Sequence, residues 1–222
     1  MLQTIKSHFL KNHTLLSNLQ EPQLEDLHRI SRIKELKNGQ GIKLNDKEIY
    51  LLIEGKLKVS EIDAEGNEII KEIVSEGGVF GDISRENRAS CEFVQALSYR
   101  VLLCVIPAAN FEWFLERNPS LAVKFSKAVW TKFRLTESKY ANLVLKDARA
   151  RLINFFKEWA LKEGIRDGKK FTVKNYLTHE EVASLICTTR VTVTTILNKL
   201  RKEGIIRYSK KIIEIPDIQA LR

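Results

Sequence analysis

The sequence predicts an α+β protein built from a β-rich N-terminal domain, a long central helix and a C-terminal winged helix-turn-helix domain. Short apolar runs broken by glycine fill residues 33–106, and a helical apolar period follows Pro107. A capped pair of short helices with a tight turn then covers residues 177–206. A chain of 222 residues has room for two ordinary domains. The expected divisions of the chain are residues 1–117, 118–145 and 146–222.

Positive charge is concentrated in the last third of the chain. Of 37 Lys and Arg and 28 Asp and Glu, residues 146–222 hold 17 and 9, so they carry +8 of the net +9. Between Cys187 and Lys211 the single acidic residue is Glu203. Such a polarity favours a polyanionic partner at one end of the protein over a merely solvated basic face.

Other features exclude whole classes of protein. No apolar run approaches the roughly 18 residues of a membrane span, and the start MLQTIKSHFLKNH lacks the apolar stretch of a signal peptide. We therefore expect a cytoplasmic protein with no membrane partner. Cys91, Cys104 and Cys187 are scattered, which is typical of small buried hydrophobes, and the histidines form no pair at ligand spacing. No metal site and no catalytic residue is predicted.

The N-terminal part begins with one or two expected short helices, one of them starting at Pro22. The strands predicted after it are the runs IYLLIEG, KLKVSEI, NEIIKEIV, CEFVQAL and YRVLLCVI. The sequence DAEGNE between two of them is typical of a hairpin turn. Many short strands at close spacing predict an antiparallel, jelly-roll-like β-roll rather than a parallel sheet.

The long helix carries apolar residues on more than one side. Steps of four and three residues, typical of a coiled-coil seam, join Val129, Phe133, Thr136, Tyr140 and Leu143. A second apolar set comprises Leu121, Phe125, Trp130 and Leu135. The helix can therefore pack on the β-domain with one face and on a second copy of itself with another. We expect a homodimer with the seam as its interface, and a core helix within one chain is the alternative.

Seven of the eight residues in TTRVTVTT, residues 188–195, are β-branched, a composition typical of strands. Yet Val193, Ile196, Leu197 and Leu200 recur at the spacing of a buried helix face. Each β-branched residue costs a helix up to about 0.7 kcal/mol relative to alanine, whereas burial of each large aliphatic contributes roughly 1.5 to 3 kcal/mol. Packing outweighs propensity, and a helix is predicted.

The flanking residues carry helix signals. Thr178 begins a capping box, Thr188 or Thr189 is placed to cap the second helix, and Gly204 is placed to end it. The sequence IIRYSKKIIEI that follows predicts two strands joined by a basic turn, which is a wing. Upstream, Asp147 is placed to cap the helix in LKDARARLINFFKEWALKEG, and GIRDGKKF is expected to be a loop.

The unburied residues of the second helix suit a DNA duplex. Arg190, Val191, Thr194 and Thr195 are expected on its outward face near its N-terminus, where major-groove readers place their base contacts. Arginine pairs with guanine edges, and threonine offers a hydroxyl to a base or phosphate and a methyl group to thymine. Double-stranded DNA is therefore the expected partner.

With these motifs the chain resembles, over nearly its whole length, the cyclic AMP receptor protein/fumarate-nitrate regulator (CRP/FNR) superfamily of bacterial transcription factors. The resemblance rests on DAEGNEII and GGVFGD in the β-roll, ESKYANLVLKDARARL at the end of the long helix, and LTHEEVASLICTTRVTVTTILNKLRKEGII. It implies a cyclic-nucleotide-binding-type β-roll, a homodimer on a near-palindromic DNA site, and RNA polymerase as a further partner. Thr178 and His179 match positions that touch phosphate. The candidate DNA contacts are Thr178, His179, Thr188, Thr189, Arg190, Val191, Thr192, Thr194, Thr195, Lys199, Lys210 and Lys211.

The recognition residues depart in part from the family pattern. Arg190 matches the first base-reading arginine, but the family's neighbouring glutamate is Val191 and its second arginine is Thr195. The usual glycine of the turn is Cys187. Valine cannot accept a hydrogen bond from cytosine, so we expect an operator unlike the family's best-known half-site, with contact to a thymine methyl group as one option.

The nucleotide cassette departs further from the family. Its Gly-Glu pair is replaced by Gly-Asp, and its phosphate-binding Arg-Ser pair is split by one residue. On the long helix, Thr136 matches an adenine-contacting position, but the next residue is not the family's serine. The candidate effector-binding residues are Gly81, Asp82, Arg88, Ser90, Thr136 and Glu137. We expect no cyclic AMP binding and no cofactor, and the identity of any effector is left open.

The sequence features described above distinguish three candidate functions. The first is a homodimeric DNA-binding regulator, gated by an unidentified small molecule in the β-roll or competent without one. The second is a metal-dependent β-barrel enzyme, which needs two or three histidines with a carboxylate, whereas residues 33–106 contain no histidine. The third is a module that binds a protein through the long helix, which leaves the basic C-terminal third unexplained.

Overall fold

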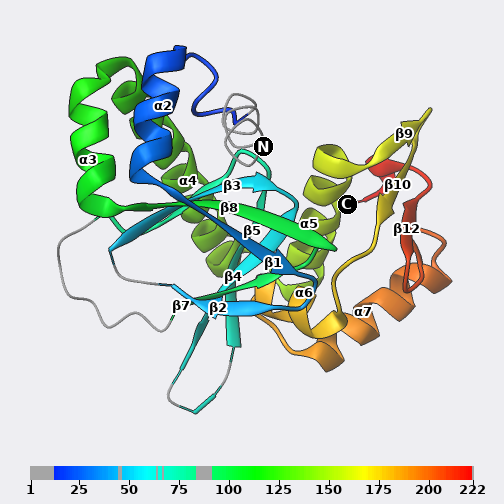
Figure 1. The fold of residues 1–222 in the computed structure, drawn as a ribbon. Coiled ribbons are helices and arrows are strands. Elements are labelled where there is room, and N and C mark those ends of the chain that lie inside the picture. Colours follow the sequence, from blue (N-terminus) through cyan, green and yellow to red (C-terminus); the bar gives the residue numbers. More distant parts are fainter. Residues whose placement is uncertain (1–12, 45–46, 64, 67, 84–91, 222) are drawn as a thin grey trace. The chain divides into compact units, whose positions relative to one another are not determined.

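The computed structural model describes residues 13–44, 47–63, 65–66, 68–83 and 92–221 (Figure 1). The chain divides into two compact units, residues 1–133 and 134–222, and both contain helices and antiparallel strands, so the predicted α+β class is confirmed. The first unit contains α2 (Glu21–Ile30), β1 (Arg32–Lys37), β2 (Gly41–Lys43), β3 (Glu48–Glu54), β4 (Lys56–Ile62), β5 (Glu68–Ser75), β6 (Val79–Gly81), β7 (Glu92–Ala96), β8 (Arg100–Pro107), α3 (Ala108–Arg117) and the start of α4 (Pro119–Leu145). The second contains the end of α4, α5 (Ala148–Glu163), β9 (Ile165–Asp167), β10 (Lys170–Lys174), α6 (His179–Leu185), α7 (Arg190–Lys202), β11 (Arg207–Tyr208), β12 (Ile212–Ile215) and a short 3₁₀ helix (Ile218–Ala220).

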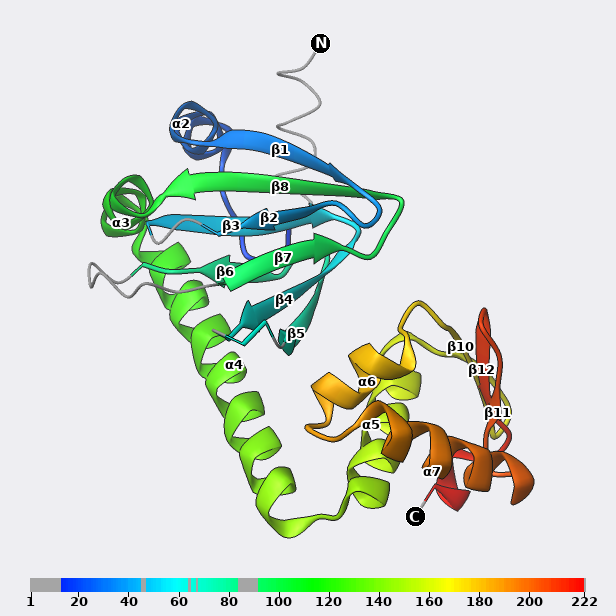
Figure 2. The ribbon, with the colours of Figure 1, turned by 90° about the horizontal axis from the view of Figure 1, so that it is seen from below.

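The strands of the first unit form two four-stranded sheets, with strand orders β1-β8-β3-β6 and β2-β7-β4-β5. Every neighbouring pair is antiparallel, which confirms the predicted β-roll (Figure 2). The five strands predicted from apolar runs are β3, β4, β5, β7 and β8. In the predicted hairpin turn between β4 and β5, Gly66 has a φ of +87° and its N–H donates to the Asp63 carbonyl at 3.1 Å.

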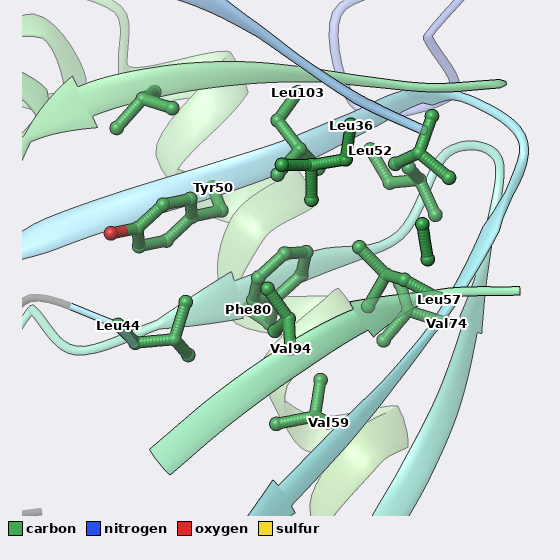
Figure 3. Close-up of a cluster of buried hydrophobic side chains, with 13 residues drawn as sticks. Leu36, Leu44, Tyr50, Leu52, Leu57, Val59, Val74, Phe80, Val94 and Leu103 are labelled. Atoms are coloured by element: carbon green, nitrogen blue, oxygen red, sulfur yellow. The ribbon is translucent and has the colours of Figure 1, made fainter. Parts of the chain in front are cut away.

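Buried side chains fill the space between the two sheets (Figure 3). Most are aliphatic, and among them Tyr50 stacks on Phe80 at a ring-centroid distance of 5.2 Å. The buried Glu48 carboxylate accepts from the Tyr50 hydroxyl at 2.7 Å and from Arg32 at 2.7 Å, so its charge is compensated. At Gly81 a Cβ atom would lie 2.3 Å from the Glu48 carbonyl oxygen, so only glycine lets β6 lie this close to β3.

A second apolar cluster of the first unit joins α2, α3 and the start of α4 to residues of β3 and β8. Leu121 and Phe125 of α4 pack in it, whereas Trp130 and Leu135 of the same predicted apolar set are exposed. The helical period after Pro107 is broken at Asn118, whose side-chain amide donates to the Phe114 carbonyl at 2.8 Å. The structure therefore has two helices, α3 and α4, where the apolar period alone indicates continuous helix.

The part of α4 that follows this cluster is exposed. Every residue in the range 126–141 is exposed within the single chain. The predicted seam residues Val129, Phe133, Tyr140 and Leu143 are among the exposed large hydrophobic residues. The alternative of a core helix buried within one chain is therefore wrong for this part of α4.

The second unit combines α5, α6 and α7 with a four-stranded antiparallel sheet of order β11-β12-β10-β9. Asp147 caps α5 as predicted, since its carboxylate accepts from the Ala150 N–H at 2.8 Å. The predicted loop in GIRDGKKF is wrong, because β9 and β10 form a hairpin there with Gly168 in its turn. All three residues of β9 are exposed, so the stretch shows no alternation that would indicate a strand.

The cysteines only partly follow their expected burial. Cys104 is buried in the cluster beside α3, as predicted, whereas Cys187 lies exposed in the turn between α6 and α7, so its predicted burial is wrong. Cys91 lies outside the described residues. Among the described residues no helix is long and apolar enough to cross a membrane, and no group of three or more His, Cys, Asp and Glu could hold a metal ion.

Ile70 and Ile69 are adjacent in β5 but differ in burial, with 4% and 55% of each residue exposed. We expect Ile70→Ala to lower the free energy of unfolding by about 2 to 5 kcal/mol, because it leaves a cavity in the packed interior. Ile69→Ala, the matched control, should change that free energy by less than about 0.5 kcal/mol. Urea unfolding followed by circular dichroism measures both, and equal losses would contradict the burial pattern of β5.

Candidate DNA-binding interface

The first helix of the pair, α6, is fixed at its N-terminus by the predicted capping box. The Thr178 hydroxyl accepts from the Glu181 N–H at 3.2 Å, and a Glu181 carboxylate oxygen accepts from the Thr178 N–H at 2.8 Å. Thr178 is exposed, and His179, the first residue of α6, is partly buried. The capping box therefore sets where these two predicted phosphate contacts lie.

The turn between α6 and α7 contains a strained residue. Cys187 has a φ of +54°, in the left-handed region that favours glycine. This conformation explains why the family that the sequence resembles usually has glycine at this position. The Thr188 N–H donates to the Ala183 carbonyl at 2.9 Å and closes the turn.

Helix α7 covers Arg190–Lys202, so the predicted helix in the β-branched run is confirmed. Of the two candidate caps left open by the sequence, Thr189 is the cap, since its hydroxyl accepts from the Thr192 N–H at 3.2 Å. Of the predicted buried face, Val193, Leu197 and Leu200 are buried, whereas Ile196 is only partly buried. Gly204 follows the helix with a φ of +71°, as expected of a glycine that ends a helix.

Two threonines of α7 use their hydroxyl groups within the protein. The Thr192 hydroxyl lies 2.9 Å from that of Thr189, and the Thr194 hydroxyl donates to the Arg190 carbonyl at 2.8 Å. The Nδ1 atom of His179 lies 2.8 Å from the same Thr194 oxygen. Because the one hydroxyl hydrogen of Thr194 goes to Arg190, we infer that His179 Nδ1 carries the hydrogen and that Nε2 of the neutral ring is an acceptor.

Other residues of α7 keep their side chains free for a ligand. Arg190 and Thr195 are exposed, and Val191 is 74% exposed. Within the described part of the chain, the Thr195 side chain forms no hydrogen bond. Asn198 is also exposed and lies on the same helical face, seven residues after Val191. Asn198 is not among the DNA contacts predicted from the sequence, although its spacing places it beside Thr195.

The predicted wing is present as β11, a turn and β12, with Lys210 and Lys211 exposed in the turn. The buried Asn175 holds this turn in place. Its N–H donates to the Lys211 carbonyl at 2.8 Å, and its side-chain amide donates to the Ser209 carbonyl and the Tyr208 hydroxyl, both at 3.0 Å. Asn175 follows β10 and belongs to no motif, so sequence reasoning misses it.

Most of the positive charge of this surface forms no ion pair. Glu203, the single acid between Cys187 and Lys211, pairs with Arg149 of α5 at 2.9 Å, and Arg207 lies 3.8 Å from Glu214. The other cations between Cys187 and Lys211 are exposed and form no ion pair with any described residue, namely Arg190, Lys199, Arg201, Lys202, Lys210 and Lys211. All the predicted DNA contacts lie on α6, the turn, α7 or the wing, so the structure gathers them in one domain.

The predicted effector residues do not belong to a single described unit. Gly81 and Asp82 follow one another at the end of β6 in the first unit, and Gly81 is explained by its close approach to β3. Thr136 and Glu137 lie on the exposed part of α4 that belongs to the second unit. Arg88 and Ser90 lie outside the described residues. Effector binding by these residues stays a prediction.

A capped helix pair with an exposed cationic face and a basic wing defines a winged helix-turn-helix DNA-binding protein. Residues 150–222 match the family of Crp-like helix-turn-helix domains, and residues 41–118 match the cyclic nucleotide-binding domain family. The global nitrogen regulator of Nostoc sp. is 30% identical over 169 residues, which cover 75% of this chain and 76% of that protein. The chain therefore belongs to the CRP/FNR family of DNA-binding transcription regulators.

Other similarities agree with this assignment. The CRP-like cAMP-activated global transcriptional regulator of Mycobacterium tuberculosis is 25% identical over 180 residues, 78% of this chain and 77% of that protein. The structure of a CooA mutant from Carboxydothermus hydrogenoformans shares the fold, with a TM-score of 0.77, 24% identity and coverage of 95% and 94% of the two chains. The named relatives are transcription regulators, so the chain falls in that class and not among metal-dependent enzymes.

His179 makes DNA binding sensitive to pH if it contacts phosphate as expected. Burial, and next the positive charge of Arg190, lower the pKa of His179 below its ordinary value. A neutral ring offers phosphate only the lone pair of Nε2, so the contact requires protonation. Phosphate raises the pKa in the complex, and binding takes up a proton. Affinity should rise as the pH falls, by up to about tenfold per pH unit, between the pKa of the complex and the lower pKa of the free protein.

Fluorescence anisotropy titrations from about pH 5.5 to about pH 8.5 measure this dependence across the ordinary histidine range. His179→Arg is the control, because its side chain carries a positive charge at every pH tested. The variant should bind DNA with little change over the range. A His179→Arg profile as steep as that of the wild type would show that another group takes up the proton.

Proposed function

We propose that the protein is a homodimer that binds a near-palindromic DNA site, with one α7 helix in each of two successive major-groove turns. The observation that carries this proposal is the division of α7 into two faces. Val193 and Leu200 are sealed inside the domain, while Arg190 and Val191 project from the N-terminal turn of the helix. Two-fold symmetry would set the two recognition helices about 34 Å apart.

Each half-site is read by few side chains. Arg190 pairs with the O6 and N7 atoms of a guanine, and Val191 with the Thr195 methyl group contacts thymine methyl groups. The Thr194 hydroxyl is engaged with the Arg190 carbonyl, so it supports the helix rather than a base. Lys199 and the wing lysines neutralise phosphates, which adds affinity without sequence preference.

The exposed stripe of α4 supports the dimer. Phe133 and Tyr140 are 51% and 70% exposed, and Trp130 stacks on Phe133 at a centroid distance of 5.6 Å. An exposed apolar stripe of this length marks an interaction surface. Its alternating steps of four and three residues fit the same helix of a second copy, because such a seam faces its partner continuously along a coiled coil.

Binding to DNA is proposed not to require cyclic AMP. Buried side chains of the β-roll, including the Tyr50–Phe80 stack, pack together between its two sheets. The family's ribose-binding glutamate is replaced by Asp82, whose side chain is one methylene shorter. The protein is then controlled by a small molecule of different chemistry or by its own abundance. It acts in the cytoplasm, with RNA polymerase as its further partner.

The test is a DNA-binding series on operator and random fragments, the operator being selected from genomic DNA with purified protein. Arg190→Ala should cost about 1 to 3 kcal/mol on the operator and relax the preference at one base pair of each half-site. Lys210→Ala, a matched loss of one charge, should weaken operator and random DNA alike and reduce the salt dependence by about one phosphate contact.

Two outcomes would contradict the proposal. The first is a wild-type protein with no preferred fragment, or with an affinity that ignores salt. The second is an equal effect of the two variants on operator and random DNA. The same titrations with cyclic AMP added should give an unchanged affinity for DNA. A large gain in that affinity would contradict the proposal that DNA binding does not require cyclic AMP.

The dimer is tested by placing a charge in the seam. Phe133→Glu should weaken dimerisation by at least about a hundredfold, since an unpaired buried charge costs several kcal/mol. Ser138→Glu puts the same charge on an exposed position of α4 outside the seam and should leave the dimer intact. Sedimentation equilibrium over a range of concentrations measures both. A wild type that is monomeric throughout, or a Phe133→Glu dimer of unchanged affinity, would refute the interface.

A further inference from the structure

Arg151, in the first turn of α5, joins two parts of the second unit that are distant in the sequence. Its Nη1 donates to the Lys146 carbonyl at 2.7 Å, its Nε to the Ile186 carbonyl at 2.8 Å and its Nη2 to the Cys187 carbonyl at 3.0 Å. Lys146 follows the last residue of α4, and Ile186 and Cys187 begin the turn that leads to α7. One side chain thus binds the end of α4 and the helix-turn-helix turn together.

The three acceptors are carbonyl groups at helix ends, where the helical hydrogen-bond pattern stops. Helix α4 ends at Leu145 and α6 at Leu185, and the left-handed backbone of Cys187 takes its carbonyl out of the α6 direction. The guanidinium is planar and holds its donors in a fixed fork, so it fixes the relative positions of all three carbonyls. A lysine ammonium has no such fork and cannot hold the three together in this geometry.

The connection between α4 and α5 is therefore held by hydrogen bonds at Lys146. The Lys146 N–H donates to the Asn142 carbonyl of α4 at 3.0 Å, and the Lys146 carbonyl accepts from Arg151. A rotation of α5 against α4 in this connection breaks the Arg151 bond. Motion of the end of α4 is then passed on to the turn before α7 and is not absorbed by the connection.

We propose that Arg151 is a positioning residue that fixes the direction of α7 relative to the end of α4, and so sets the half-site spacing that a dimer accepts. The inference rests on the proposed dimeric binding to DNA. Helix α7 begins three residues after Cys187, so its N-terminus follows the turn that Arg151 holds. Its other end is held by the Arg149–Glu203 ion pair, which does not involve α4.

The experiment is a spacing series with the full-length protein. Operators are built with the spacer between half-sites shortened or lengthened by about one or two base pairs, each of which moves a half-site by about 3.4 Å and turns it about the duplex. A single half-site is measured in parallel. The wild type should prefer one spacing by about tenfold or more, equal to about 1.4 kcal/mol.

Arg151→Gln should lose about tenfold in affinity at the preferred spacing and keep its affinity for the single half-site within about twofold, so that the spacing profile flattens. Arg151→Lys keeps the charge and should flatten the profile as well, and it carries the test if the glutamine variant does not fold. Lys157→Gln is the matched control. It removes one charge from an exposed position of the same helix and should keep the wild-type profile.

An Arg151 variant that keeps the sharp wild-type profile would overturn the inference. So would a variant that loses as much affinity for the single half-site as for the full operator, because Arg151 would then only stabilise the domain. If the wild type itself selects no DNA sequence, the proposed function fails instead. A wild type that binds the operator without any spacing preference would also overturn this role of Arg151, while leaving sequence-specific binding in place.

Discussion

The burial of one face of α7 is the interaction on which the DNA-binding half of the protein depends. Val193, Leu197 and Leu200 are sealed in the domain, and their burial outweighs the cost of a helix made largely of β-branched residues. Helix geometry then leaves no choice for the opposite face. Once the leucines point inward, Val191 and Thr195 must point to solvent. A packing constraint thus selects the residues that can meet a base.

Apolar packing fixes the rotation of α7 about its axis, but polar contacts at helix ends fix where it starts and which way it runs. The Thr189 cap sets the first turn, and the Arg149–Glu203 pair restrains the last. Asn175 does the same for the wing through three hydrogen bonds to its backbone and to Tyr208. These contacts involve few atoms, yet they decide the direction of every side chain that carries the function.

The difference between local features and contacts with distant residues explains what the sequence can predict. Features set by neighbouring residues are predictable, such as the capping box at Thr178, the helix end at Gly204 and the five strands with apolar runs. Features that need a distant partner are not. Arg151 is one of many basic residues in its third of the chain, and nothing local shows that its partners are 35 and 36 residues away. The β9–β10 hairpin is missed for a related reason, because its fully exposed first strand has no apolar side to reveal it.

The exposure of Val191 has an evolutionary consequence under the proposed mode of DNA binding. Its side chain supports no part of the core, so an exchange at this position would change which operator is favoured and would cost the fold almost nothing. Leu197, six residues further along on the buried face, has no such freedom. After gene duplication, one copy can therefore acquire a new set of promoters through one or two substitutions while its architecture is inherited unchanged.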